Sequence, residues 1–248
     1  MSRRRPRWMI VAAVAATLVA GIGIGAHDDI GILIRADLKT SANQHIVHAL
    51  DDGSTIELDS QSAVEFRYSV KERRVVLLRG QVYVAARPTD ANEPRPFVVE
   101  ARNGVTRALG TNFNVNALDK TVEVIAVRHR IAVSAEACSS SPAIVTLSPG
   151  QGVRYSRNGQ IRHETIAPAL GIAWRKGLVV IDRATLRDAG ERLRRYSDRP
   201  IHLWSDRREK LRISGVFDAD DVEGALTLIA REHGLRLRKL PLIGFVLS

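Results

Sequence analysis

Cysteine and aromatic residues are scarce in this sequence. Cys138 is its one cysteine, so the chain cannot form an internal disulfide. Three serines and a proline follow it at 139–142, which is typical of a loop rather than of the surroundings of a nucleophile. Aromatic residues make up 5% of the chain, so its core must be built mainly from aliphatic side chains. The sequence therefore predicts a fold that is held together by packing alone.

Catalytic and metal-binding motifs are also missing. His45 and His48 are three residues apart, but no cluster of cysteine or carboxylate side chains accompanies them. Asp51 and Asp52 precede a glycine and are interpreted as turn residues. Ser214 lacks the context of a nucleophile elbow, and there is no glycine-rich phosphate loop. We therefore predict no enzyme activity, no cofactor and no metal site.

The net charge of +10 does not indicate a nucleic-acid binder. Cations are spread along the whole chain and are interleaved with acids, as where Arg187 and Arg192 lie beside Asp188 and Glu191. A nucleic-acid footprint is usually a concentrated basic patch with aromatic residues or a known motif. With 45% hydrophobic and 26% charged residues, the 248-residue chain has the composition of a folded protein.

One long apolar run lies near the N-terminus, from Trp8 to Ala26. Four arginines precede it within residues 3–7, and Asp28 and Asp29 follow it. The run is about as long as a minimal membrane-spanning helix, and the charges place its start in the cytoplasm. The sequence thus predicts a single-pass inner-membrane protein whose bulk lies in the periplasm. A cleaved signal peptide is the alternative, although the small residues that cleavage requires are poorly placed.

Three residues of this run are candidates for the membrane anchor. Trp8 stands where an interfacial anchor would lie. Gly21 and Gly25 form a Gly-x-x-x-Gly pair, which can mediate helix pairing in lipid.

Short strands are predicted from about Ile46 to Val153. Hydrophobic residues alternate with polar ones in segments such as 55–58, 64–68 and 122–124, and turn signals such as Asp52-Gly53 separate the segments. Alternation with turns every ten or so residues is typical of an all-β domain.

The last quarter changes to a mixed pattern. A short apolar strand at 178–181 precedes Thr185-x-x-Asp188, which resembles a capping box, and a helix that ends before Pro200. The scheme repeats with a strand at 211–216 and a helix that starts near Asp220. The pattern therefore predicts a small α+β domain made of two successive β-α-β units. The predicted divisions are a cytoplasmic stub at 1–7, a transmembrane helix at 8–26, a β domain at 44–158, a linker at 159–171 and a C-terminal α/β domain at 172–248.

Six short motifs follow one another along the chain in a recognisable order. They are Leu50-Asp51-Asp52-Gly53-Ser54-Thr55-Ile56-Glu57-Leu58, Val76-Leu77-Leu78-Arg79-Gly80-Gln81-Val82-Tyr83-Val84, Arg95-Pro96-Phe97-Val98-Val99, Ala108-Leu109-Gly110-Thr111-Asn112-Phe113-Asn114-Val115, Leu147-Ser148-Pro149-Gly150-Gln151 and Trp174-Arg175-Lys176-Gly177. In this order they resemble the FecR-type transmembrane sensors, the anti-sigma regulators of cell-surface signalling. The resemblance covers roughly residues 44 to 248. The C-terminal part also resembles the short domain shared by secretins and outer-membrane transducers.

The resemblance implies a relay. In this family the periplasmic part docks on the signalling domain of a TonB-dependent outer-membrane transducer, and the message reaches an extracytoplasmic-function sigma factor, as in the regulation of iron uptake. The chain departs from the family in two places. About seven residues precede the apolar run, where the family carries a cytoplasmic sigma-binding domain, so a separate protein or an upstream start would supply that domain. Arg128-His129-Arg130 stands where the family tends to have Glu-Gly.

Partner contacts are expected on exposed strand edges of the last domain. Our candidate contact strands contain Leu211, Ile213, Leu235 and Leu237, and an edge of this kind can accept a partner strand. The same side chains could instead be core, with only the edge backbone open to binding. A second hypothesis from another class is a bitopic scaffold that carries lipid or polysaccharide across the periplasm. It predicts an apolar groove and gives no reason for the β-α-β pair.

Overall fold

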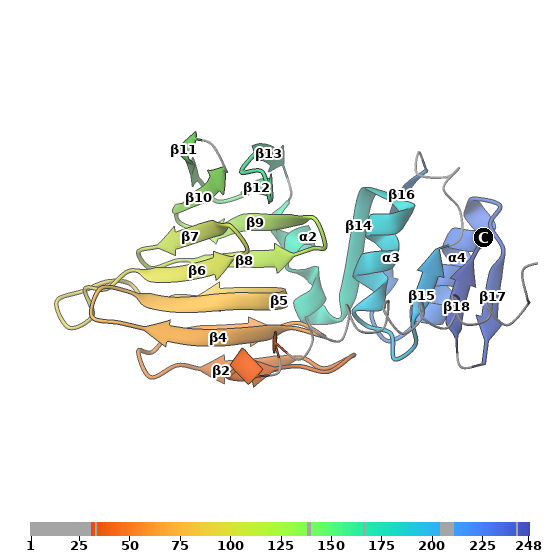
Figure 1. The fold of residues 1–248 in the computed structure, drawn as a ribbon, viewed down its shortest axis with the longest axis horizontal. Helices are drawn as coiled ribbons and strands as arrows, with labels where there is room; N and C mark the ends of the chain where they lie inside the picture. The colour runs from red at the N-terminus through yellow and green to blue at the C-terminus, as the bar shows by residue number, and fades with distance from the viewer. Residues whose placement is uncertain (1–30, 33, 138–139, 166, 204–210, 242) are drawn as a thin grey trace, which may run out of the picture. The chain divides into compact units, whose positions relative to one another are not determined.

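The computed structural model describes residues 31–32, 34–137, 140–165, 167–203, 211–241 and 243–248. The chain divides into two compact units, Met1–Ala36 and Asp37–Ser248. All of the strands and helices named below lie in the second unit (Figure 1).

Most of the strands belong to one 13-stranded sheet. Along its main path the strands follow the order β11-β10-β7-β6-β5-β8-β9-β12-β13, and β1 to β4 pair off this path. The strands are β1 (Leu38–Lys39), β2 (Ile46–Ala49), β3 (Thr55–Leu58), β4 (Ala63–Tyr68), β5 (Arg73–Ala85), β6 (Phe97–Ala101), β7 (Gly104–Ala108), β8 (Asn112–Ala117), β9 (Thr121–Arg128), β10 (Ile131–Ala137), β11 (Ser140–Leu147), β12 (Gln151–Ser156) and β13 (Ile161–Thr165).

Strand β5 joins the two halves of this sheet. Its first part, Arg73–Leu77, pairs with β6 in parallel and with β4. Its second part, from Gly80 to Ala85, pairs with β8, and β3 lies on its other side. The inward side chains of both halves meet in one hydrophobic core, to which Val75 and Phe97 contribute from one half and Phe113 from the other. The sheet therefore encloses its own core, as the period-two alternation of its strands requires.

Gly80 stands at the change of partners within β5. Its φ is +85°, a backbone conformation that L side chains rarely adopt. A Cβ atom at this position would lie 2.2 Å from Ser62 Oγ and 2.5 Å from Ser62 Cα. Both the backbone angle and the close approach of Ser62 therefore require glycine.

Replacing this glycine tests the junction of the two half-sheets. We expect Gly80→Ala to lower the free energy of unfolding by about 3 kcal/mol. The new methyl group would clash with the backbone of Ser62, and alanine would also be strained at this positive φ. Gly234→Ala is the matched control: its φ is +62°, but nothing lies within 4 Å of the added carbon. The control is expected to cost about 1 kcal/mol. Equal losses for the two variants in urea unfolding would contradict the role of close packing at Gly80.

The C-terminal part has two small sheets and two longer helices. Strands β14 and β16 pair antiparallel, while β15 and β17 lie on either side of β18. The elements are α2 (Pro168–Gly171), the 3-10 helix η1 (Ala173–Lys176), β14 (Leu178–Thr185), α3 (Leu186–Arg194), β15 (Ile201–Leu203), β16 (Arg212–Asp218), α4 (Val222–Glu232), β17 (Leu237–Leu240) and β18 (Gly244–Leu247).

Both longer helices begin at side-chain caps. Thr185 Oγ1 accepts a hydrogen bond from Asp188 N, as its capping pattern predicts. The second helix is capped by Asp221, whose carboxylate accepts from Gly224 N, so it begins one residue later than predicted. Its apolar stripe is buried in a second core together with the apolar face of α3. The buried stripe of α4 is Val222, Ala225, Leu226, Ile229 and Ala230.

The structure contradicts the predicted fold class. The two expected β-α-β units do not form, because no strand pairs with the strand that follows its own helix: β14 pairs with β16 instead of β15, and β16 pairs with β14 instead of β17. Periodicity identifies a strand or a helix but carries no information on which strand it will pair with. The chain is instead dominated by one large sheet, with short helices near its C-terminal end.

The predicted fold class also included a membrane span. No helix among the described residues is long and apolar enough to cross a membrane. The predicted span at 8–26, with Trp8, Gly21 and Gly25, lies outside the described residues, as does Cys138.

Candidate functional site

One face of the large sheet is polar although it is buried. In β8, Phe113 and Val115 enter the hydrophobic core, while Asn114 and Asn116 point to the opposite face. These two asparagines are only 1% and 2% exposed, because the C-terminal part covers them. Buried amides of this kind need hydrogen-bond partners, so the covering elements must supply polar groups.

A row of four polar side chains crosses this face. Gln81 of β5 lies opposite Asn116, Asn116 lies opposite Glu123 of β9, and Glu123 lies opposite Arg154 of β12. We call these four residues the polar row. Side chains that are directly opposite on neighbouring strands share a face, so the pairing registers alone bring the four together.

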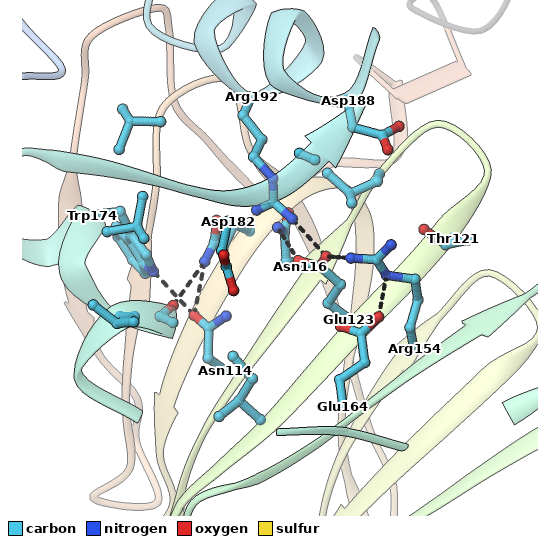
Figure 2. Close-up of a pocket in the computed structure, with 18 of the residues that line it drawn as sticks. Asn114, Asn116, Thr121, Glu123, Arg154, Glu164, Trp174, Asp182, Asp188 and Arg192 are labelled. Carbon is cyan, nitrogen blue, oxygen red and sulfur yellow. Dashed lines mark hydrogen bonds and ion pairs between the residues drawn. The ribbon is translucent and has the colours of Figure 1, made fainter. Parts of the chain in front are cut away.

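Two arginines of the C-terminal part meet the polar row. Arg192 lies in the last turn of α3 and Arg195 is the C-cap residue of that helix, three residues later. This spacing places both on one face of the helix, while Ala189 and Leu193 enter the second core from another face. A cavity of about 490 Å³ lies between this part and the polar face of the sheet (Figure 2).

Arg195 contacts Gln81, Asn116 and Asp59. Its guanidinium donates to Gln81 Oε1 at 2.8 Å and to Asn116 Oδ1 at 2.9 Å, and it lies 3.4 Å from Asp59 Oδ2. The neighbouring Tyr196 donates its hydroxyl to the same Asp59 oxygen at 2.6 Å. Burial raises the pKa of Asp59 above its usual range, although Arg195 and Tyr196 act in the opposite direction. One carboxylate thus receives both an arginine and a tyrosine from the C-terminal part.

Glu123 is the second centre of charge. Its Oε1 atom accepts from Arg192 at 2.6 Å and from Arg154 at 2.5 Å, while Asn116 donates to Oε2 at 3.1 Å. Burial alone would raise the pKa of this carboxyl, but the two arginines outweigh it and hold the pKa below its usual value. Glu123 therefore stays ionised and holds Arg192 against the sheet.

Asn114 links the sheet to the 3-10 helix η1. Its Oδ1 atom accepts from Trp174 Nε1 at 3.1 Å and from Gln81 Nε2 at 3.2 Å. Its Nδ2 atom has no hydrogen-bond partner among the described residues. Figure 2 shows Asn114 and Trp174 beside the cavity, with dashed lines converging on the amide oxygen. Asn114 therefore lines the cavity, and its unused donor is buried in the cavity wall.

A third ion pair fixes the end of η1. Arg175 donates to both oxygens of Glu57, at 2.7 and 2.5 Å, and its guanidinium lies 4.0 Å from the ring centroid of Tyr83. His45 Nε2 lies 3.4 Å from Glu57, and its ring meets Trp174 edge-on at 5.3 Å. A bidentate arginine with a ring beneath it has little freedom, so η1 is held in one orientation.

The residues predicted as partner contacts lie elsewhere. Ile213 of β16 and Leu235 are buried in the second core, and Leu211 and Leu237 are half-buried against it. None of the four lines the cavity. Among the described strands, β16 pairs only with β14 and β17 only with β18, so each has one edge without a ladder partner. Their role as contact strands stays a prediction.

The sequence did carry a signal for the polar face. The asparagines of β8 recur with period two, and Arg192 and Arg195 at the C-terminal end of α3 are three apart, so each set was visible from local spacing. What the sequence could not show is that strand and helix face each other. His45 and His48 do not combine: His45 meets Glu57, whereas His48 stacks on Phe66. Among the described residues there is no group of three His, Cys, Asp or Glu that could hold a metal ion.

A family model described as FecR protein matches residues 36–131. This stretch of the chain is thus similar to the FecR family. The predicted resemblance to FecR-type sensors is confirmed by this match. The matched residues include Asp59, Asn114 and Glu123 of the site, whereas Arg154, Trp174 and Arg195 come from the residues that follow the match.

Two solved structures share the fold over most of the chain. Both are crystal structures of a proposed anti-sigma factor from Parabacteroides distasonis, at 1.65 and 2.50 Å resolution, with 23% and 22% sequence identity. Each covers 85% of this chain and 97% of its own, with TM-scores of 0.75 and 0.74. No curated protein matches the chain. The shared fold therefore extends beyond the FecR match into the C-terminal part.

Removing the Arg195 guanidinium tests the polar junction. We expect Arg195→Met to lower the free energy of unfolding by about 3 kcal/mol, because Asp59 is left buried with less compensation. The matched control is Arg194→Met, whose side chain is 53% exposed and lies 3.7 Å from Asp119. Exposed pairs of this kind are worth less than about 1 kcal/mol. Urea unfolding measures both variants. Equal losses of unfolding free energy would show that Arg195 contributes no more to stability than the exposed Arg194.

Glu123 makes the stability depend on pH in a defined direction. Because its pKa is lower in the folded chain, its contribution is complete above its ordinary value of 4.5 and is lost as pH falls through the lowered pKa. We expect Glu123→Gln to lose less stability between pH 7 and pH 3 than the native chain does. The exposed Glu136→Gln should behave like the native chain. A Glu123→Gln variant with the native pH dependence in urea unfolding would refute this assignment.

Proposed function

We propose that this chain is a regulatory sensor that relays a signal from an outer-membrane receptor to an extracytoplasmic-function sigma factor. The observation that carries the proposal is the match to the FecR family at residues 36–131. The solved proteins that share the fold over 85% of this chain are named as a proposed anti-sigma factor, which agrees with regulation of a sigma factor. The role is one of binding and transmission rather than of catalysis.

The partners follow from this proposal. The unit Asp37–Ser248 binds the periplasmic signalling domain of a TonB-dependent transducer, and the output reaches the sigma factor directly or through a separate cytoplasmic domain. The chain then works at the inner membrane with its bulk in the periplasm. The arginines before the apolar run at 8–26 and the acids after it support this orientation.

The polar junction gives the relay a physical basis. Buried ion pairs are close to neutral in net stability, so a junction built from them can be separated at lower cost than an apolar one. Arg192, Arg195 and Arg175 hold three points of the C-terminal part against carboxylates of the sheet. Partner binding that competes for any of these carboxylates would change how firmly the C-terminal part is held.

A deletion experiment tests the relay. In the bacterium that carries the gene, we expect deletion to change transcripts that depend on one extracytoplasmic-function sigma factor. RNA sequencing measures the change. The native gene and the Arg194→Met variant should restore the native pattern, while Arg195→Met should not, because its junction is weakened. Crosslinking of the tagged native chain in the same cells should recover an outer-membrane receptor.

Two outcomes would count against the relay. The first is that no sigma-dependent group of transcripts changes. The second is that crosslinking recovers lipid-transport components and no receptor, which would favour the scaffold hypothesis.

A further inference from the structure

The cavity beside the polar face is lined by almost the whole of β14. Residues from both faces of this strand take part: Val179 belongs to the second core, whereas Val180 belongs to the opposite face. Successive side chains of a strand point to opposite faces. A cavity that is lined by consecutive residues must therefore lie at the edge of the strand rather than on one face. The lining residues from β14 are Leu178, Val179, Val180, Asp182, Arg183, Ala184 and Thr185.

This edge of β14 has no ladder partner. Among the described strands, β14 pairs with β16 alone, and β16 contributes only Arg212 to the cavity lining, so we infer that the cavity meets the other edge of β14. The edge is regular from Leu178 to Ile181. Beyond it the register shifts between Ile181 and Ala184, and Arg183 has a φ of +44°. A bulge of this kind ends regular pairing, so about four residues of backbone face the cavity as an open strand edge.

The opposite wall offers a buried donor. Asn114 is 1% exposed, lines the cavity, and leaves its Nδ2 atom without a partner among the described residues. An unmade hydrogen bond at a buried amide is costly, and an acceptor that reached Nδ2, which is itself buried beside the cavity, would relieve it. Figure 2 shows this side chain projecting toward the space between the sheet and α3.

Three arginines that line the cavity already have partners within the protein. Arg154 and Arg192 are both engaged by Glu123, and Arg195 is engaged by Asp59 and the amides of the polar row. These three arginines are thus held by carboxylates and amides of the protein itself. A ligand that presents alternating neutral donors and acceptors fits this wall better than an anion or a cation does.

We propose that the cavity binds an extended peptide segment, which adds as a strand to the edge of β14 and accepts a hydrogen bond from Asn114. A volume of about 490 Å³ lies within the usual range of ligand sites. Three or four residues of strand span roughly 10–13 Å, which matches the regular edge. Backbone hydrogen bonds supply the affinity in binding of this kind.

The segment belongs to a partner protein rather than to a free oligopeptide. Leu170 and Leu178 line the cavity but are 45% and 38% exposed, and Val216, opposite Val180 on β16, is 58% exposed. A partner larger than the cavity would cover these apolar side chains, and a tripeptide would not. The assignment of the segment to a partner protein rests on the proposed function, since a relay needs a protein partner. The proposal that the cavity binds an extended peptide does not depend on that function.

The first test uses peptides and the native full chain. A display library of random twelve-residue peptides is selected on the chain, and an enriched peptide is titrated. Two analogues carry N-methyl groups on alternate residues of the bound segment. We expect one analogue to lose binding at least about tenfold and the other to keep it, because alternate N–H groups of an added strand point to its neighbour.

Hydrogen exchange of the complex then locates the peptide. Amides of Leu178–Ile181 should gain protection. Protection at Leu237–Leu240 instead, equal effects of the two analogues, or no enriched peptide would each overturn the proposal. A tetrapeptide that binds as tightly as the twelve-residue peptide would overturn the partner-protein source.

A single-atom variant tests the donor. Asn114→Asp keeps the oxygen that accepts from Trp174 and Gln81 but replaces the unused Nδ2 donor with an acceptor. We expect it to weaken the enriched peptide about tenfold, the value of one hydrogen bond. Asn158→Asp is the matched control, because Asn158 is exposed in a turn and does not line the cavity. Equal affinities for both variants would contradict the role of Asn114.

The two proposals fail separately. If no peptide binds but deletion changes the sigma-dependent transcripts as expected, the relay is supported and the β14 site is ruled out. If a peptide binds at β14 but deletion changes no sigma-dependent transcripts, the β14 site is supported and the relay is ruled out.

Discussion

The contact of Arg195 with the polar row is the interaction on which the arrangement of this protein depends. Its guanidinium reaches Gln81 and Asn116 on the sheet and lies beside the buried Asp59. A buried arginine with three such partners tolerates little displacement, because each partner would be left unsatisfied if it moved. The position of α3, and with it the wall of the cavity, follows from this contact.

Polar side chains hold the C-terminal part against the sheet, whereas apolar side chains form the core of each part. The sheet and the C-terminal part each have a hydrophobic core of their own, and the surfaces between them carry amides, carboxylates and arginines. Such a junction is specific in geometry but gains little net stability, since desolvation offsets much of the attraction. The combination suits a protein whose two parts must hold a defined relation and change it when a partner binds.

The sequence predicted local structure better than it predicted pairing. The alternation around Val82 and Val84, the Thr185 cap and the stripe from Val222 to Ala230 all lie where the structure has a strand or a helix. The partners of β14 and β16 were wrong because long-range pairing is decided by the whole fold. The polar row escaped prediction for the same reason: Gln81 is far from Asn116 and Glu123 in the chain, and these side chains meet only through strand register.

A double-mutant cycle between Asp59 and Arg195 tests the central claim most directly. The variants Asp59→Asn and Arg195→Met, and the two combined, are compared with the native chain in urea unfolding. If the two side chains hold the junction together, their effects are not additive, and the coupling free energy is at least about 1 kcal/mol. Effects that add to within about 0.5 kcal/mol would show that Arg195 and Asp59 act independently, and the polar junction would then not be what positions the C-terminal part.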